Sequence, residues 1–296
     1  MIKCRYVVED IKDIQGDQVE NAIENSNFFI SFKGNRRNIF DFTSDIEFGE
    51  KFIFVNDMDE AILRDKLNNL ISKSTDDDIS VCIDISLISR KVLSDIMSIL
   101  SILCVNKNLV IKIIYSLAKY APPSKGRFYN NLVKPVSNFF RGWALKPGMP
   151  VMTIVGIGYE RDKAIGAIEY LESSKTMVYI PDSVESAYRA DVLDENSNII
   201  SSVGADSLIN YTVERPSEII YSLDTLIGSH KNSFKTVLLP FGPKIFFAAS
   251  LISAIAHPET SVWYVSGEEK DFNSSQDRDI VSCIGFSCSI KTFFPK

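Results

Sequence analysis

The sequence predicts an α/β protein whose C-terminal half is a Rossmann-like, doubly wound, mainly parallel sheet. Apolar runs rich in Val, Ile and Tyr recur along that half, at residues 151–155, 176–180, 207–213, 236–240 and 261–265. Helical patterns alternate with these runs, and strands that alternate with helices of about ten or more residues indicate parallel β–α–β units. The runs are almost continuously apolar, which is typical of strands that are covered on both faces of a sheet.

The helices expected between these strands cover residues 161–172, 183–192, 216–229 and 243–256. The start of the last helix is marked by two residues. Gly242 follows the strand at 236–240, and Pro243 suits the first position of a helix, where its missing N–H is no loss. We therefore expect a C-terminal Rossmann-like domain at residues 150–296.

The N-terminal part of the chain shows a weaker version of the same pattern. Strands are expected at residues 51–55, 79–85 and 109–115, and helices at residues 57–73 and 89–105. Before them, residues 27–42 are expected to form a hairpin that turns at Lys33-Gly34-Asn35. We expect an N-terminal α/β lobe at residues 1–116, so that the chain forms two α/β lobes or one continuous large sheet.

A basic aromatic segment, residues 117–149, connects these two parts. It contains no acid, and its basic residues are Lys119, Lys125, Arg127, Lys134, Arg141 and Lys146. Its prolines and glycines make it a poor regular element, and long loops in compact domains are usually functional or disordered. Its aromatic content argues against disorder. The residues expected to contact nucleic acid or a protein partner are Lys125, Arg127, Lys134, Phe139, Arg141 and Trp143.

The composition excludes several classes of protein. The chain has 296 residues, 45% of them hydrophobic, and its net charge of −6 is too mild for a wholly basic nucleic-acid binder. The N-terminus has no apolar core of signal-peptide length, and the longest apolar stretch, 245–256, is shorter than the roughly 20 residues that span a bilayer. We therefore expect a cytoplasmic protein without a membrane partner. The five cysteines are expected to be structural thiols, and we expect neither a metal site nor a cofactor.

Candidate site residues follow the predicted strands, because an open parallel sheet binds ligands outside the carboxyl ends of its strands. The candidates for ligand binding are Ser86, Arg90, Gly156, Gly158, Arg161, Gly242 and Lys244. The candidates for acid–base catalysis are Asp84, Glu160 and Asp182. Asp84 is suited to a general base, to a ribose ligand or to a place in the core, and Ser86 is suited to a helix cap.

The glycine-rich junction after residues 151–155 leaves two interpretations open. Gly156 and Gly158 let the backbone turn sharply, so that N–H groups at the next helix end can face an anion. The dinucleotide fingerprint GxGxxG is incomplete, because Arg161 stands where a third small residue is required. Glu160 complements the helix dipole and would repel a phosphate. The junction is therefore a ligand-binding loop or a tight turn, and Lys244 is an anion ligand or a solvated lysine.

At the level of the fold, this pattern resembles the Rossmann-like sensor domains of prokaryotic immune systems. The resemblance implies a subunit that recognises a nucleotide or a nucleic-acid phosphate in antiviral defence, and fold-level analogy is its basis. Aromatic residues interleaved with Lys and Arg can stack on bases and contact phosphates. Two alternatives stay open: an enzyme that processes a nucleotide or phosphometabolite, and a non-catalytic subunit that binds a protein or a second copy of the chain. The scarcity of histidine and of catalytic motifs favours binding over catalysis.

Overall fold

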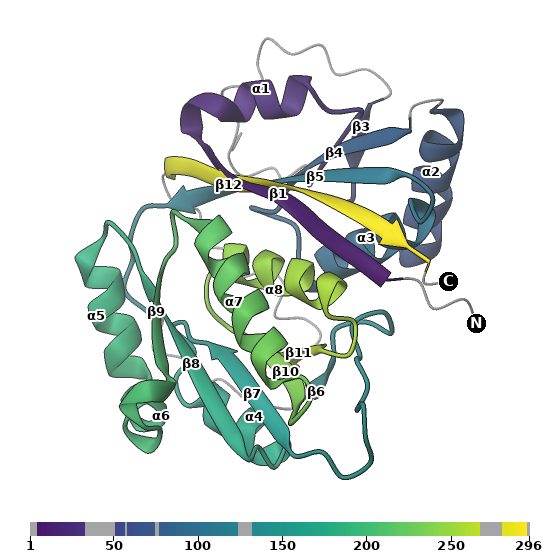
Figure 1. Cartoon of the computed structure of the whole chain (residues 1–296). Coiled ribbons are helices and arrows are strands. Elements are labelled where there is room, and N and C mark those ends of the chain that lie inside the picture. Colours follow the sequence, from purple (N-terminus) through teal and green to yellow (C-terminus); the bar gives the residue numbers. More distant parts are fainter. Residues whose placement is uncertain are drawn as a thin grey trace. The chain divides into compact units, whose positions relative to one another are not determined.

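The structure is a computed structural model that describes residues 5–32, 51–56, 58–74, 77–123, 132–266 and 280–294 (Figure 1). The chain divides into two compact units. Unit 1 is discontinuous and consists of Met1–Lys119 and Ser275–Lys296, and unit 2 consists of Tyr120–Ser274. Each unit is built around one six-stranded sheet.

Unit 1 contains a mixed sheet with the strand order β1-β12-β5-β4-β2-β3. Its elements are β1 (Arg5–Gln15), α1 (Val19–Glu24), β2 (Phe28–Ser31), β3 (Phe52–Phe54), α2 (Glu60–Lys73), β4 (Asp78–Asp84), α3 (Arg90–Leu103), β5 (Asn108–Ala118) and β12 (Ile280–Phe293). The strands β5, β4, β2 and β3 run parallel, and β12 runs antiparallel to both β1 and β5.

The strands and helices predicted for the N-terminal part correspond to β3, α2, β4, α3 and β5. Side-chain caps fix the starts of both helices: Asp59 accepts a hydrogen bond from the Ile62 amide (2.8 Å), and Ser89 accepts one from the Val92 amide (3.2 Å). The expected hairpin differs in its first arm, because β2 is paired on both sides with parallel strands. Its turn at Lys33-Gly34-Asn35 lies outside the described residues.

Residues 280–294, grouped with the C-terminal domain in the sequence analysis, contribute β12 to the sheet of unit 1. In Figure 1 this strand is yellow and crosses the sheet beside β1 and β5. Gly285 allows its close approach to β5, because a Cβ at this position would overlap the carbonyl oxygen of Ile113. Neither β1 nor β12 was expected from the sequence.

Unit 2 contains a sheet with the strand order β6-β11-β10-β7-β8-β9. Its elements are β6 (Leu132–Pro135), β7 (Val151–Gly156), α4 (Lys163–Tyr170), β8 (Lys175–Asp182), α5 (Ser186–Glu195), α6 (Ser197–Ser202), β9 (Leu208–Thr212), α7 (Pro216–His230), β10 (Lys235–Pro240), α8 (Lys244–Ala256) and β11 (Ser261–Ser266). All neighbouring pairs are parallel except β6 with β11. The two mostly parallel sheets with helices between their strands confirm the predicted α/β fold.

Helices cover both faces of the sheet in unit 2. Successive side chains of a strand point to opposite faces, so the contacts of neighbouring strand residues show which helix lies on which face. On one face, Val155 and Val178 pack in a core that includes Ala164 of α4 and residues of α5 and α6. On the other face, the ring of Tyr179 lies 5.4 Å from that of Phe246 in α8, and its hydroxyl is hydrogen-bonded to Ser222 of α7. Figure 1 shows these two groups of helices. Thus α4 and α8, which follow the neighbouring strands β7 and β10, leave the sheet on opposite faces.

Candidate functional site

The candidate site of unit 2 lies at the carboxyl end of its sheet, between the loops that follow β7 and β10. These strands are neighbours, and their register pairs Gly156 with Pro240 at the carboxyl end. Beyond this point one chain turns to α4 and the other to α8. Loops that diverge in this way form the crevice in which open α/β sheets bind ligands. Most of the site residues predicted from the second half of the sequence follow these two strands. We use the name switch-point crevice for the residues of these two loops, 157–162 and 241–244, where the topology predicts a ligand site.

Two buried glycines, one from each loop, pack against each other. A Cβ on Gly158 would lie only 3.0 Å from the Cα of Gly242, and a Cβ on Gly242 would lie 2.5 Å from the carbonyl oxygen of Ile157. The amide of Gly242 also donates a 2.9 Å hydrogen bond to the carbonyl of Gly156. Both Gly158 and Gly242 are buried. Larger residues at these two positions would therefore force the two loops apart.

Gly156, a predicted ligand-binding residue, has a packing reason to be glycine. A Cβ at this position would overlap the aromatic ring of Phe246 in α8. That ring also lies 5.1 Å from the ring of Tyr211 in β9. The absence of a side chain on Gly156 thus lets α8 pack closely on the sheet beneath the switch-point crevice.

The loop from Gly158 to Asp162 is held by two asparagines that the sequence analysis does not single out. Asn196 is buried and donates a 2.7 Å hydrogen bond to the carbonyl oxygen of Gly158. Asn198 donates a 2.9 Å hydrogen bond to Oδ1 of Asp162, which has a positive φ of 54°. Asn196 lies at the end of α5 and Asn198 lies in α6, so no motif within the loop itself could have revealed them.

The charged residues of the two loops differ in position. The carboxylate of Glu160 lies over Gly158, with Oε2 only 2.7 Å from the place of a Cβ on that glycine. Arg161 is exposed, and its Nε lies 3.9 Å from Oε2 of Glu195. Lys244 is half-buried and is the first residue of α8, two positions after Gly242. The crevice thus has a carboxylate on its β7 side and a lysine on its β10 side.

A second polar group lies at the carboxyl ends of β8 and β9. The carboxylate of Asp182 is 52% exposed, and its Oδ2 lies 3.8 Å from Nη1 of Arg189. Arg189 also donates a 2.8 Å hydrogen bond to Oδ1 of Asn210 in β9. Glu214, which the sequence analysis does not single out, accepts a 2.7 Å hydrogen bond from the hydroxyl of Ser183. Because β8 pairs with β7, Asp182 lies at the carboxyl end of the strand next to the one that leads to Gly158.

Two of the candidates of unit 1, Asp84 and Ser86, form a turn at the carboxyl end of β4. Asp84 is 2% exposed, and its Oδ1 accepts hydrogen bonds from the amide (3.0 Å) and the hydroxyl (2.6 Å) of Ser86. Its Oδ2 accepts a 3.2 Å hydrogen bond from the hydroxyl of Ser31 in β2. The hydroxyl oxygen of Ser86 in turn accepts from the amide of Ser116. Arg90 is the first residue of α3. Asp84 and Ser86 therefore link β2, β4 and β5.

The described part of the basic aromatic segment follows the edge of unit 2. Lys134 is exposed on β6, and the exposed Arg141 and half-buried Phe139 follow it. The side chain of Trp143 is 51% exposed, yet its amide donates a 3.0 Å hydrogen bond to the carbonyl of Glu259. The segment thus presents an exposed indole on an anchored backbone. Lys125 and Arg127 lie outside the described residues.

Beside this anchor, His257 bridges two carboxylates. Its Nε2 lies 2.7 Å from Oδ1 of Asp224 in α7, and its Nδ1 lies 3.7 Å from Oε1 of Glu259. Burial by itself would lower the pKa of His257, but the interactions with Glu259 and Asp224 outweigh it and raise the pKa above its ordinary value. Burial likewise opposes the lowering of the pKa of Glu259, which His257 brings about. The arrangement ties the end of α8 to α7.

The buried thiols are poor nucleophiles at neutral pH. Burial raises the pKa of Cys104 to about 11 and the pKa of Cys283 to about 12. Within the part of the chain that the structure describes, no three His, Cys, Asp or Glu side chains are gathered in a way that could hold a metal ion. Among the same residues, no helix is long and apolar enough to cross a membrane.

In comparisons with known proteins, no family model matches the chain and no curated protein sequence matches it. The geometry of the switch-point crevice and of the basic aromatic segment is therefore the basis for assigning a function.

Proposed function

We propose that unit 2 is a Rossmann-like binding module that holds a nucleotide or a related phosphorylated metabolite in the switch-point crevice, and that the protein acts as a binding subunit. The observation that carries the proposal is the contact of Gly158 with Gly242. These buried glycines bring the backbones of the two loops close together at the point where the loops after β7 and β10 diverge. A ligand can approach backbone closely only where such residues stand. The strand order β9-β8-β7-β10-β11 supports this proposal, because in chain order it corresponds to the doubly wound order 3-2-1-4-5.

The charges along the crevice suggest how the ligand is oriented. The carboxylate of Glu160 lies over Gly158 and disfavours a phosphate there. Glu160 and the exposed Asp182 are suited to accept hydrogen bonds from ribose hydroxyls or from an amine. Lys244 begins α8 and is suited to attract a phosphate, to which the helix N-terminus adds a favourable dipole. We therefore expect the phosphate on the β10 side and the hydroxyl groups on the β7 and β8 side.

Calorimetric titration of the full chain with ATP, GTP, CTP and UTP tests this proposal. We expect saturable binding of at least one nucleotide. Lys244→Ala should raise its Kd by about tenfold or more, because a charge-assisted hydrogen bond is lost. Lys231→Ala is the matched control. Lys231 directly follows α7 and precedes β10, so it lies toward the amino ends of the strands, away from the switch-point crevice. Absence of binding at millimolar nucleotide, or equal effects of the two substitutions, would contradict the proposal.

The same mixtures test the alternative that the protein is an enzyme. Product formation from the bound nucleotide, detected by chromatography and abolished in Glu160→Gln or Asp182→Asn, would favour catalysis by the strand-end carboxylates. Binding without turnover would favour the binding subunit.

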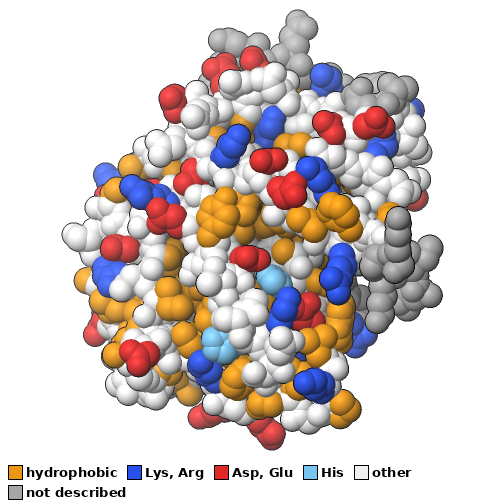
Figure 2. All heavy atoms as spheres, in the orientation of Figure 1, with side chains coloured by type: hydrophobic (Ala, Val, Ile, Leu, Met, Phe, Trp, Pro, Cys, Tyr) orange, Lys and Arg blue, Asp and Glu red, His pale blue; other side chains and the backbone are white. Residues whose placement is uncertain are grey.

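A second candidate function is the binding of nucleic acid or of a protein by the basic aromatic segment. The observation that favours it is the exposed indole of Trp143, close in sequence to the exposed Arg141 and Lys146. Figure 2 shows Lys and Arg side chains intermixed with Asp and Glu over the described part of the face in view, so that face offers no broad basic surface. On that face a nucleic-acid strand would therefore have to bind locally, through stacking and a few phosphate contacts.

Filter binding of single-stranded RNA and DNA at two salt concentrations tests this second function. Replacement of Lys134, Arg141 and Lys146 by Gln should flatten the dependence of affinity on salt, since fewer counterions are released. Trp143→Ala should lower affinity by removing about 1–3 kcal/mol of stacking. No binding at low salt, together with a co-purifying protein that is lost in Trp143→Ala, would instead favour the protein-interaction subunit.

We further propose a cytoplasmic role in prokaryotic antiviral defence, on fold-level resemblance alone. Expression of the protein with its native neighbours should lower phage plating, and Lys244→Ala should restore it. Equal plating with both forms would remove this proposal without affecting the binding measurements.

A further inference from the structure

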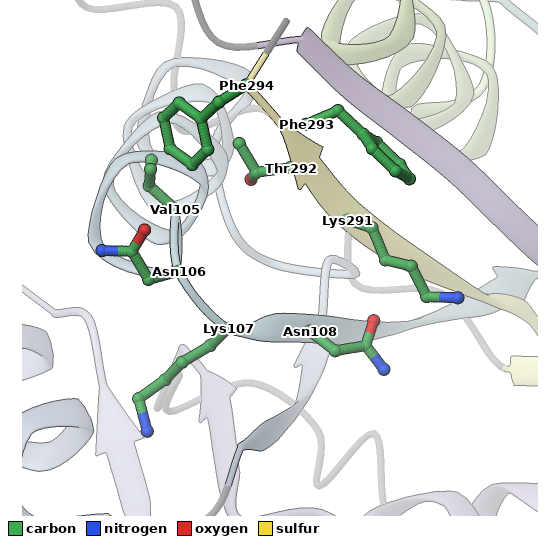
Figure 3. A pocket seen from close by; sticks show the side chains of 8 residues that line it. All are labelled: Val105, Asn106, Lys107, Asn108, Lys291, Thr292, Phe293 and Phe294. Carbon is green, nitrogen blue, oxygen red and sulfur yellow. The ribbon is translucent and has the colours of Figure 1, made fainter. Parts of the chain in front are cut away.

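We infer that unit 1 carries a second binding site, a pocket for a nucleobase, where its sheet splits between β5 and β12 (Figure 3). The pocket has a volume of about 380 Å³, which lies within the range of small-molecule sites. Its lining consists of two asparagines, two lysines, two phenylalanines, Val105 and Thr292, and contains no carboxylate. The inference concerns unit 1 alone and does not depend on the switch-point crevice.

The pocket lies where the neighbouring strands β5 and β12 separate. The pairing of β5 with β12 ends at Leu109 and Ile290. From there β12 continues beside β1 as far as Phe293, whereas β5 begins at Asn108 beside β4. On the side of β5, the backbone of residues 291–293 is therefore outside the ladder. Backbone groups at such an edge can hydrogen-bond to a ligand that lies in the plane of the sheet.

The side chains around the fork offer an aromatic surface and amide groups. Phe293 and Phe294 are 53% and 46% exposed, and Figure 3 shows the ring of Phe294 beside Val105 and the ring of Phe293 pointing away from it. Asn106 and Asn108 each carry both a hydrogen-bond donor and an acceptor. Oδ1 of Asn108 is buried and accepts no hydrogen bond from the described residues. Rotation of this amide toward a bound ring therefore costs that oxygen no existing hydrogen bond.

The charges at the pocket favour an uncharged ligand group. Nζ of Lys291 lies 2.7 Å from Oε2 of Glu9, so its charge is already paired. Nζ of Lys107 donates a 3.3 Å hydrogen bond to the carbonyl of Ser74, and Figure 3 shows this side chain extending away from the other lining residues. Both ammonium groups thus already interact with oxygen atoms of the protein, so neither is well placed to bind an anionic ligand. Recognition is therefore assigned to the Phe294 ring and the amides, and the group that suits both is a planar ring with donors and acceptors on its edge, as in a nucleobase.

Calorimetric titration of the full chain with adenosine, guanosine, cytidine and uridine tests the inference, since these probes carry the base without phosphate. We expect saturable binding of at least one nucleoside, with a Kd that is nearly independent of salt because no charge is neutralised. Phe294→Ala and Asn108→Ala should each raise this Kd by about tenfold. Ile102→Ala is the control, because Ile102 is 43% exposed on α3 and does not line the pocket. Melting curves of the variants check that each one is folded, and Asn108→Asp, which keeps the size of the side chain, replaces Asn108→Ala if the latter unfolds.

The inference would be overturned by no nucleoside binding at millimolar concentration, by binding that Phe294→Ala and Ile102→Ala affect equally, or by binding of phosphorylated nucleotides only. Nucleoside binding that is lost in Lys244→Ala but kept in Phe294→Ala would assign the base to the switch-point crevice of unit 2 and would likewise overturn it. Failure of nucleotide binding in the crevice, with nucleoside binding retained, would leave the pocket in place.

Discussion

Gly142→Ala should destabilise unit 2 through two separate effects at the anchor of the basic aromatic segment. Gly142 has a φ of +58°, a left-handed conformation that costs other residues about 1–2 kcal/mol. A Cβ at this position would also lie 2.5 Å from the carbonyl oxygen of Glu259 and 2.8 Å from the amide nitrogen of Ser261. These are backbone atoms, and Ser261 is part of β11, so relief requires a backbone shift that costs about 1–3 kcal/mol. We expect a total loss of about 2–5 kcal/mol in the free energy of unfolding.

Gly148→Ala is the matched control for this experiment. Gly148 has a φ of +72°, but nothing lies within 4 Å of a Cβ built on it. It should therefore lose only the conformational part, about 1–2 kcal/mol. Urea unfolding of both variants, followed by circular dichroism at neutral pH, measures the difference. Equal losses in the two variants would refute the close packing of residues 141–143 against the turn before β11, and with it the anchored position of Trp143.

Three further substitutions test other contacts. His257→Gln should destabilise the protein most at low pH, because folding raises the pKa of His257. The contribution of His257 to the free energy of unfolding is complete below about pH 6.5 and is lost as the pH rises through the pKa of His257 in the folded protein. Thermal unfolding across pH should therefore show a deficit that shrinks toward alkaline pH, and a constant deficit would contradict the bridge to Asp224 and Glu259. Asp84→Asn should lower the free energy of unfolding by about 1–3 kcal/mol, because one acceptor of its turn becomes a donor; an unchanged urea midpoint would argue against the turn role. Lys112→Met should speed hydrogen exchange in α1, since the Nζ of Lys112 donates to the carbonyls of Ala22 (3.1 Å) and Asn25 (2.7 Å) at the end of that helix; unchanged exchange would show that these contacts do not hold α1.

Much of the fold follows from local sequence patterns. The five apolar runs of the second half became β7 to β11, because strands buried on both faces need long stretches of Val, Ile and Leu. The strand β12 has no such signature, since serines and cysteines alternate with its apolar residues. It is specified by its pairing with β1 and β5, which are distant in the chain. Pairing over such distances leaves no local signal.

The candidate site follows from the sequence in part. The rule that ligands bind at carboxyl ends of strands led to Gly158, Gly242 and Lys244, which the fold places on the two loops of one crevice. It could not reveal Asn196, which reaches the carbonyl of Gly158 from the end of α5. It also could not tell that Gly156 makes room for a phenylalanine ring. Such contacts depend on which helix lies over a loop, and this is decided by tertiary packing.

The discontinuity of unit 1 has a consequence for the order in which the protein can assemble during translation. The strand β1 leaves the ribosome early, but its partner in the sheet is β12, and Arg5 pairs with Phe293. The whole of Tyr120–Ser274 must be synthesised in between. Until then β1 and one edge of β5 have no partner strand, and open strand edges invite pairing with other chains. The nascent N-terminal lobe should therefore depend on chaperones, and synthesis arrested before residue 280 should yield aggregates rather than a folded unit 1.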